Sequence, residues 1–230
     1  MNERRIVAAA AVWTGLSIPL FLLVFALWGA HGLSQADAMD PAKVAPFAVR
    51  APVLYAILPI VGVLMHLAAL LVVVGMHRRL AARAPLLMGA ASALGLVWIG
   101  ADTLQNLMHY GGYLGGGSPE HVAAVAAAAD AVWHAGHLPG GLWVLGLAAS
   151  ADFLSRPLRV LSVVAGAVFT LHALVFPLWP AYFGLEFLLV PVWCIWTGIA
   201  LARSPANEAV SVDQAVDADP STAAFASSPK

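Results

Sequence analysis

Charged residues are scarce in this sequence. Only 11 Lys or Arg and 12 Asp or Glu occur among its 230 residues, a charged fraction of 10%. Soluble domains carry about 25% charged residues. Hydrophobic residues make up 61% of the chain, and its mean hydropathy is +0.86. So few charges cannot cover the surface of a water-soluble globule of this size, whereas a protein surrounded by lipid has no such need.

Other absences exclude further classes of protein. The net charge is −1 and no basic face is present, so we expect no nucleic-acid partner. The single cysteine, Cys194, cannot form an internal disulfide, and we interpret it as a packing residue. The sequence contains no phosphate-binding loop, no zinc-ribbon spacing and no serine-nucleophile motif.

Long apolar runs are abundant, and a helix needs about 20 apolar residues to cross a bilayer. Six stretches qualify: Ile6–Ala30, Pro52–Met76, Pro85–Met108, His121–Ala149, Pro157–Trp179 and Tyr182–Ala202. We therefore predict an all-α fold, a polytopic integral membrane bundle of six transmembrane helices over residues 1–203. The lipid bilayer is its expected surroundings.

The distribution of basic residues predicts the orientation. Residues 31–51 form the one sizeable connection on the outer side, and that side holds only Lys43 and Arg50. The other side holds eight arginines: Arg4, Arg5, Arg78, Arg79, Arg83, Arg156, Arg159 and Arg203. Because cytoplasmic loops carry the excess of Lys and Arg, we expect both termini to be cytoplasmic. The polar residues 204–230 are expected to be a disordered cytoplasmic tail.

The first apolar stretch could also be a cleaved signal peptide. Its apolar run, however, spans about 25 residues, and the apolar region of a signal peptide is nearer 7–15. We therefore interpret Ile6–Ala30 as an uncleaved signal anchor.

Polar residues inside the predicted spans are candidates for a functional site, because ionisable groups are costly at membrane depth. The third and fourth spans carry matching sets at i, i+4 and i+7, which place each set on one helix face. These sets are Asp102, Asn106 and His109, and Asp130, His134 and His137. We expect them to face one another across a polar pocket open toward the outer side.

Counting residues from the outer helix ends puts Asp102 and Asp130 near one depth. Two carboxyl groups so placed could share a proton, since both cannot stay ionised in a low dielectric. The histidines could pass protons on, or bind a metal ion with His134, His137 and Asp130 as ligands. His66, His172 and Glu186 are additional candidates, although Glu186 is expected to extend toward the membrane interface.

The fourth span contains His137-Leu138-Pro139-Gly140-Gly141, which places a helix-breaking proline directly after a candidate histidine. Broken helices at mid-depth mark the binding sites of many transporters. Prolines are also common in membrane helices, and Pro19, Pro59 and Pro191 lie within other predicted spans, so the sequence leaves open whether this helix is interrupted.

Three segments resemble a bacterial six-helix membrane family known as domain of unknown function 4386. They are Gly140-Gly141-Leu142-Trp143-Val144-Leu145-Gly146, Arg156-Pro157-Leu158-Arg159 and Trp193…Trp196-Thr197-Gly198-Ile199. The resemblance covers roughly residues 6–203 and implies a multi-pass protein of the bacterial plasma (inner) membrane. It implies no site residues, because the family has no established activity.

Several functions remain open at this point. The leading hypothesis is a membrane protein that handles protons, metal ions or a small solute in the polar pocket. A di-haem b-type electron carrier, with His66, His109, His137 and His172 as axial ligands, is a second. His66 and His137 match in depth, but His109 and His172 differ by about 10 Å. A non-catalytic scaffold and a membrane-embedded metal hydrolase are the others.

Overall fold

In the computed structural model, the described residues are 2–34, 37–114, 118–176, 178 and 183–204, and they are helical without any strand. The α-helices are α1 (Glu3–Ala30), α2 (Pro41–Arg50), α3 (Pro52–Leu80), α4 (Pro85–Leu114), α5 (Pro119–Ser150), α6 (Arg156–Val175) and α7 (Phe183–Arg203). A short 3-10 helix, η1 (Asp37–Met39), precedes α2. The predicted all-α class is thus confirmed. Of the predicted tail, residues 204–230, all but Ser204 lie outside the described residues.

Four helices are long and apolar enough to cross a membrane: α1, α3, Pro85–Gly112 of α4 and Gly184–Arg203 of α7. Large apolar side chains are also exposed along the outside of all six long helices, among them Leu23, Leu67, Val97, Leu138, Leu174 and Leu188. Soluble monomers rarely expose contiguous apolar surface on this scale. These features suggest a membrane protein.

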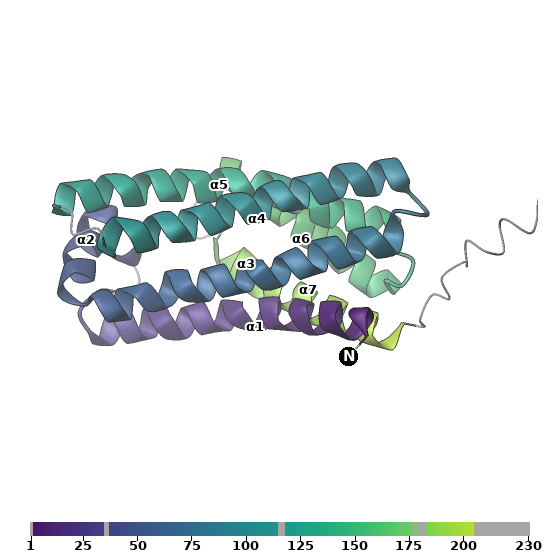
Figure 1. Ribbon diagram of the computed structural model, residues 1–230, viewed down its shortest axis with the longest axis horizontal. Coiled ribbons are helices and arrows are strands. Elements are labelled where there is room, and N and C mark those ends of the chain that lie inside the picture. The colour runs from purple at the N-terminus through teal and green to yellow at the C-terminus, as the bar shows by residue number, and fades with distance from the viewer. Residues whose placement is uncertain (1, 35–36, 115–117, 177, 179–182, 205–230) are drawn as a thin grey trace, which may run out of the picture.

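The six long helices form a closed ring in chain order. Each packs against the next along the chain, and α7 returns to pack against α1. Short connections between successive helices make neighbours antiparallel. Figure 1 shows the long helices aligned along the long axis of the molecule, with α2 across one end. A ring encloses an interior that residues from every long helix can line.

The end of the ring opposite α2 gathers the arginines, and we call it the arginine end. Arg78 at the end of α3 lies 3.0 Å from Glu3 at the start of α1. Arg83 in the α3–α4 connection pairs with Asp152 in the α5–α6 connection. These ion pairs join helix ends that are far apart in the sequence.

The interior divides into two halves. Toward the arginine end it is a solid apolar core, whose fully buried members include Val73, Met76, Met88, Trp143 and Leu158. Toward α2 it contains a cavity of about 210 Å³. The first half is therefore dry and tightly packed, and the second can hold water or a small molecule.

The α2 end is closed by a helix that the sequence analysis described only as an outer connection. Asp40 caps α2 by accepting from the Ala42 N–H at 3.0 Å, and Pro41 stands at its first position, where proline is well tolerated. Beneath α2, Trp28 stacks on Tyr55 at 5.3 Å and packs against Phe47. This apolar lid covers part of the cavity at that end.

Of the two alternatives that the sequence left open for the fourth span, the structure shows the continuous helix. The helix α5 continues through Pro139 to Ser150. The glycines after the proline bring α5 against α6, since a Cβ atom at Gly141 would lie 2.3 Å from the Thr170 backbone nitrogen and 2.6 Å from the Gly166 carbonyl oxygen. Small residues that allow helix backbones to approach are typical of membrane bundles. The Gly-Gly pair therefore serves close packing.

We expect Gly141→Ala to destabilise the protein by about 1–3 kcal/mol, because the added methyl group meets backbone atoms that cannot move aside. Gly100→Ala is the matched control, because no atom lies within 4 Å of its added Cβ atom. Thermal unfolding in detergent should show a lower midpoint for Gly141→Ala and an unchanged or higher one for Gly100→Ala. Equal midpoints for the two variants would contradict the close α5–α6 contact.

Candidate functional site

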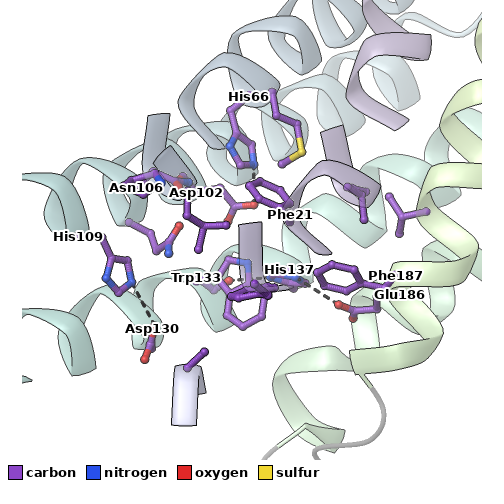
Figure 2. Close-up of a pocket in the computed structure, with 18 of the residues that line it drawn as sticks. Phe21, His66, Asp102, Asn106, His109, Asp130, Trp133, His137, Glu186 and Phe187 are labelled. Carbon is purple, nitrogen blue, oxygen red and sulfur yellow. Dashed lines mark hydrogen bonds and ion pairs between the residues drawn. The ribbon is translucent and has the colours of Figure 1, made fainter. Parts of the chain in front are cut away.

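The cavity is lined by residues from all six long helices (Figure 2). Much of its wall is apolar, with Phe21, Trp133, Phe169 and Phe187 among the lining residues. Its polar and ionisable lining residues are Thr14, Tyr55, His66, Asp102, Gln105, Asn106, His109, Asp130, His137 and Glu186. A mainly apolar cavity with a few convergent polar groups is the usual form of a small-molecule site.

On one wall, His66 of α3 pairs with Asp102 of α4. The His66 Nδ1–H donates to the Gly62 carbonyl oxygen at 2.7 Å, so Nε2 is directed at Asp102 Oδ2, 3.0 Å away. The Trp98 indole N–H donates to the same Oδ2 atom at 2.7 Å. Because two lone pairs would repel, one proton must lie between Nε2 and Oδ2. The pair therefore holds one exchangeable proton.

The other carboxyl oxygen of Asp102, Oδ1, takes no part in this pairing. Asp102 is 3% exposed, and among the described residues its Oδ1 atom has no hydrogen-bond partner. A Cβ atom at Gly136 of α5 would lie 2.8 Å from this oxygen, so the carboxyl group fits against a glycine. A buried acceptor without a donor is costly, by about 1–3 kcal/mol. Asp102 can therefore accept one further hydrogen bond or a proton.

Nearer to α2, His109 of α4 connects Tyr55 of α3 to Asp130 of α5. Its Nδ1 atom lies 2.9 Å from the Tyr55 hydroxyl, and its Nε2 atom lies 3.3 Å from Asp130 Oδ1. The Tyr55 O–H can donate to Nδ1 while the Nε2–H donates to the carboxylate. Asp130 is partly exposed, so this group lies at the outer part of the cavity.

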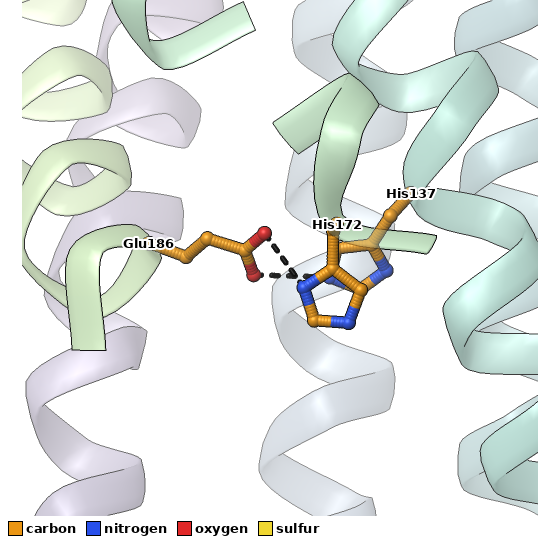
Figure 3. A group of neighbouring side chains, drawn as sticks. All are labelled: His137, His172 and Glu186. Carbon is orange, nitrogen blue, oxygen red and sulfur yellow. Dashed lines mark hydrogen bonds and ion pairs between the residues drawn. The ribbon is translucent and has the colours of Figure 1, made fainter. Parts of the chain in front are cut away.

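A third group combines α5, α6 and α7 around Glu186 (Figure 3). Glu186 Oε1 lies 2.7 Å from His172 Nδ1, and Oε2 lies 3.5 Å from His137 Nε2. On its far side, His172 Nε2 lies 2.8 Å from His134 Nδ1. The His137 Nδ1–H donates to the Trp133 carbonyl oxygen at 2.8 Å. The imidazoles of His137 and His172 stack at 4.0 Å.

The structure brings most of the predicted site residues together. Asp102, Asn106 and His109 all line the cavity, as do Asp130 and His137 of the second set. His134 does not, because it lies between α5 and α6 against His172. The predicted metal set of His134, His137 and Asp130 is therefore divided, with Asp130 paired to His109 instead.

The equal depth predicted for Asp102 and Asp130 is wrong. Asp102 lies level with Gly136, six residues beyond Asp130 along α5, an offset of about 9 Å at the helical rise. Each carboxyl group has its own histidine, so the structure shows no Asp–Asp pair sharing a proton. Packing between α4 and α5 determines this offset. Counting residues from the helix ends could not predict it, because the ends themselves were uncertain.

The expected position of Glu186 is also wrong. It is 4% exposed and hydrogen-bonded to His172, so its side chain turns into the ring instead of extending to the interface. Its place in the first turn of α7 looks in the sequence like a solvated helix start. Trp98 was not among the predicted site residues, although it lies one helical turn before Asp102 and donates a hydrogen bond to it.

No family model matches this sequence, and no curated protein or solved structure matches it either. The resemblance to domain of unknown function 4386 thus stays a prediction.

We expect Trp98→Phe to lower the free energy of unfolding by about 1.5–3 kcal/mol more than Trp143→Phe does. Both side chains are buried, but Trp98 donates to the Asp102 carboxyl, whereas the Trp143 indole nitrogen has no partner among the described residues. Hydrogen bonds to charged groups are worth about this amount. Unfolding of both variants in detergent measures the difference, and similar losses would argue against a stabilising Trp98–Asp102 bond.

Proposed function

We propose that this chain is a six-span protein of the bacterial plasma membrane that exchanges protons with a small solute at the cavity inside its helix ring. Both termini and the arginine end are placed in the cytoplasm, in accordance with the excess of positive residues there. The cavity then lies in the outer half of the membrane, behind the lid formed by α2.

Six spans are supported by the ring itself. All six long helices take part in it, and all expose large apolar side chains outward. The shortest, α6, has 20 residues and would extend about 30 Å, the thickness of the hydrocarbon core. Lipid around the ring would cover these exposed apolar side chains on every long helix.

The observation that carries the proposal is the His66–Asp102 pair with its unpartnered Oδ1 atom. The pair holds one proton on the wall of a cavity, and the remaining oxygen can accept another donor. A solute with an N–H or O–H group could bind in the cavity beside this pair and exchange a proton with it. Ionisable residues within spans typically mark such proton and substrate pathways.

The depth of the cavity favours exchange with the outer side. Its lining extends to His109 and Asp130 near α2, and the solid apolar core separates it from the arginine end. In this arrangement protons and solute would enter past α2. The di-haem alternative has less support, because the two histidines predicted to share one haem, His66 and His137, each have Nε2 beside a separate carboxylate.

Proton flux into liposomes tests the proposal. Vesicles with reconstituted protein and a trapped pH-sensitive dye are exposed to an outside-acid gradient, alone and with panels of small amines, amino acids and carboxylic acids. We expect faster acidification than in protein-free vesicles in at least one condition, and a fall to that background in Asp102→Asn.

The control is Asp152→Asn, the same chemical change in an exposed carboxylate that pairs with Arg83 at the arginine end. It should retain the wild-type flux. If the folded Asp102→Asn variant kept the full flux, the proposal would be wrong. A wild-type protein without any flux would favour the scaffold interpretation.

A further inference from the structure

Three ligand atoms converge on the α7 side of the cavity from three different helices. His137, His172 and Glu186 each place one such atom within 4.8 Å of the other two. The Glu186 oxygens lie 2.7 Å from His172 Nδ1 and 3.5 Å from His137 Nε2. In a tetrahedral zinc site with bonds of 2.0–2.1 Å, ligand atoms are about 3.3 Å apart. The two measured separations lie on either side of that value.

The histidines are also oriented as metal ligands are. A ligating histidine typically hydrogen-bonds through its other ring nitrogen to a carbonyl, carboxylate or similar acceptor, which fixes the ring and its tautomer. His137 does so through Nδ1 to the Trp133 carbonyl oxygen. His172 does so through Nε2, which lies 2.8 Å from His134 Nδ1. Both remaining ring nitrogens then face Glu186.

The environment fixes the two histidine side chains. His172 is 0% exposed and stacks on Phe176 at an interplanar angle of 12°, while His137 contacts Phe169 edge-on at 4.4 Å. A site whose ligands are held by packing loses little side-chain freedom on binding. Three acceptor atoms facing one another also repel unless protons or a cation lie between them, and a divalent cation satisfies all three at once.

We propose that His137, His172 and Glu186 form a binding site for a divalent first-row transition metal, with zinc as the best match. Two imidazoles and one carboxylate are a typical zinc set, whereas calcium prefers ligand sets made of oxygen atoms and is not suited to the two imidazole nitrogens. His137 and Glu186 line the cavity, so the fourth coordination position faces it and takes water or a donor atom of a solute. His134 is a positioning residue that orients His172.

This site does not depend on the proposed proton exchange, because it uses none of the residues of the His66–Asp102 pair. It also differs from the ligand set predicted from the sequence, which combined His134, His137 and Asp130. The two sets can be distinguished by equivalent substitutions, since each contains one carboxylate.

Titration with Co²⁺ tests the site directly. Detergent-purified full-length protein is stripped with a chelator, its residual metal content is measured, and Co²⁺ is added while the visible spectrum is recorded. We expect one equivalent to give the intense absorption of tetrahedral Co²⁺, and Zn²⁺ to displace it. Glu186→Gln and His172→Asn should lose the band. In His134→Ala the spectrum should keep its shape while the affinity falls roughly 10–100-fold.

Asp130→Asn is the matched control for Glu186→Gln and should bind Co²⁺ as the wild type does. Monodisperse elution confirms that each variant is folded, and His137→Gln provides a second ligand variant should Glu186→Gln fail to fold. A wild-type protein without the tetrahedral spectrum would overturn the proposal. So would loss of binding in Asp130→Asn with retention in Glu186→Gln, which would instead assign the set predicted from the sequence.

Discussion

Carboxyl groups that point into the helix ring need partners within the ring, because burial removes most or part of the water that would solvate them. Asp102, Asp130 and Glu186 each meet this need through histidine on a neighbouring helix. Together with the His134–His172 contact, these pairs link α3 to α4, α4 to α5, α5 to α6, and α6 to α7. A different order of helices would leave buried charges unpaired, so the polar contacts favour this one ring.

The same constraint explains how glycine is used in the two halves of the interior. Toward the arginine end, glycines meet apolar side chains or backbone, as Gly75 meets Val7 and Gly198 meets the Ala8 carbonyl oxygen. In the half with the cavity, Gly62 and Gly136 provide the space that Asn106 and Asp102 occupy. Small residues thus tighten one half of the ring and accommodate polar side chains in the other.

The sequence was sufficient for features that depend on one helix at a time. Helix positions follow from runs of apolar residues, and the stripe Asp102, Asn106 and His109 follows from helical spacing, which does place all three on the cavity. The offset in depth between Asp102 on α4 and Asp130 on α5 could not be predicted, since it depends on the packing that places Asp102 against Gly136. Nor could the inward turn of Glu186, which depends on α7 closing the ring beside α6.

The helix α2 is a further feature that could not be predicted from the sequence. Its ten residues are too few to stand out by hydropathy, and its position over Trp28 and Tyr55 is a matter of tertiary packing. Without it, the outer end of the cavity would lose its apolar cover. A segment that looks like a simple connection in the sequence therefore forms part of the cover of the cavity.

The His66–Asp102 pair and the cluster of His137, His172 and Glu186 are near enough for the charge of one to affect the other. Asp102 packs against Gly136, the residue directly before His137, so the His66–Asp102 pair and the three-ligand cluster lie close together. Charges interact more strongly across a low-dielectric interior than in water. If a cation binds at the proposed site, a change of proton number at the His66–Asp102 pair would alter the binding energy of that cation, and linkage makes the effect reciprocal. A solute in the cavity that contacts both groups would therefore bind with an affinity that depends on the charge of the solute.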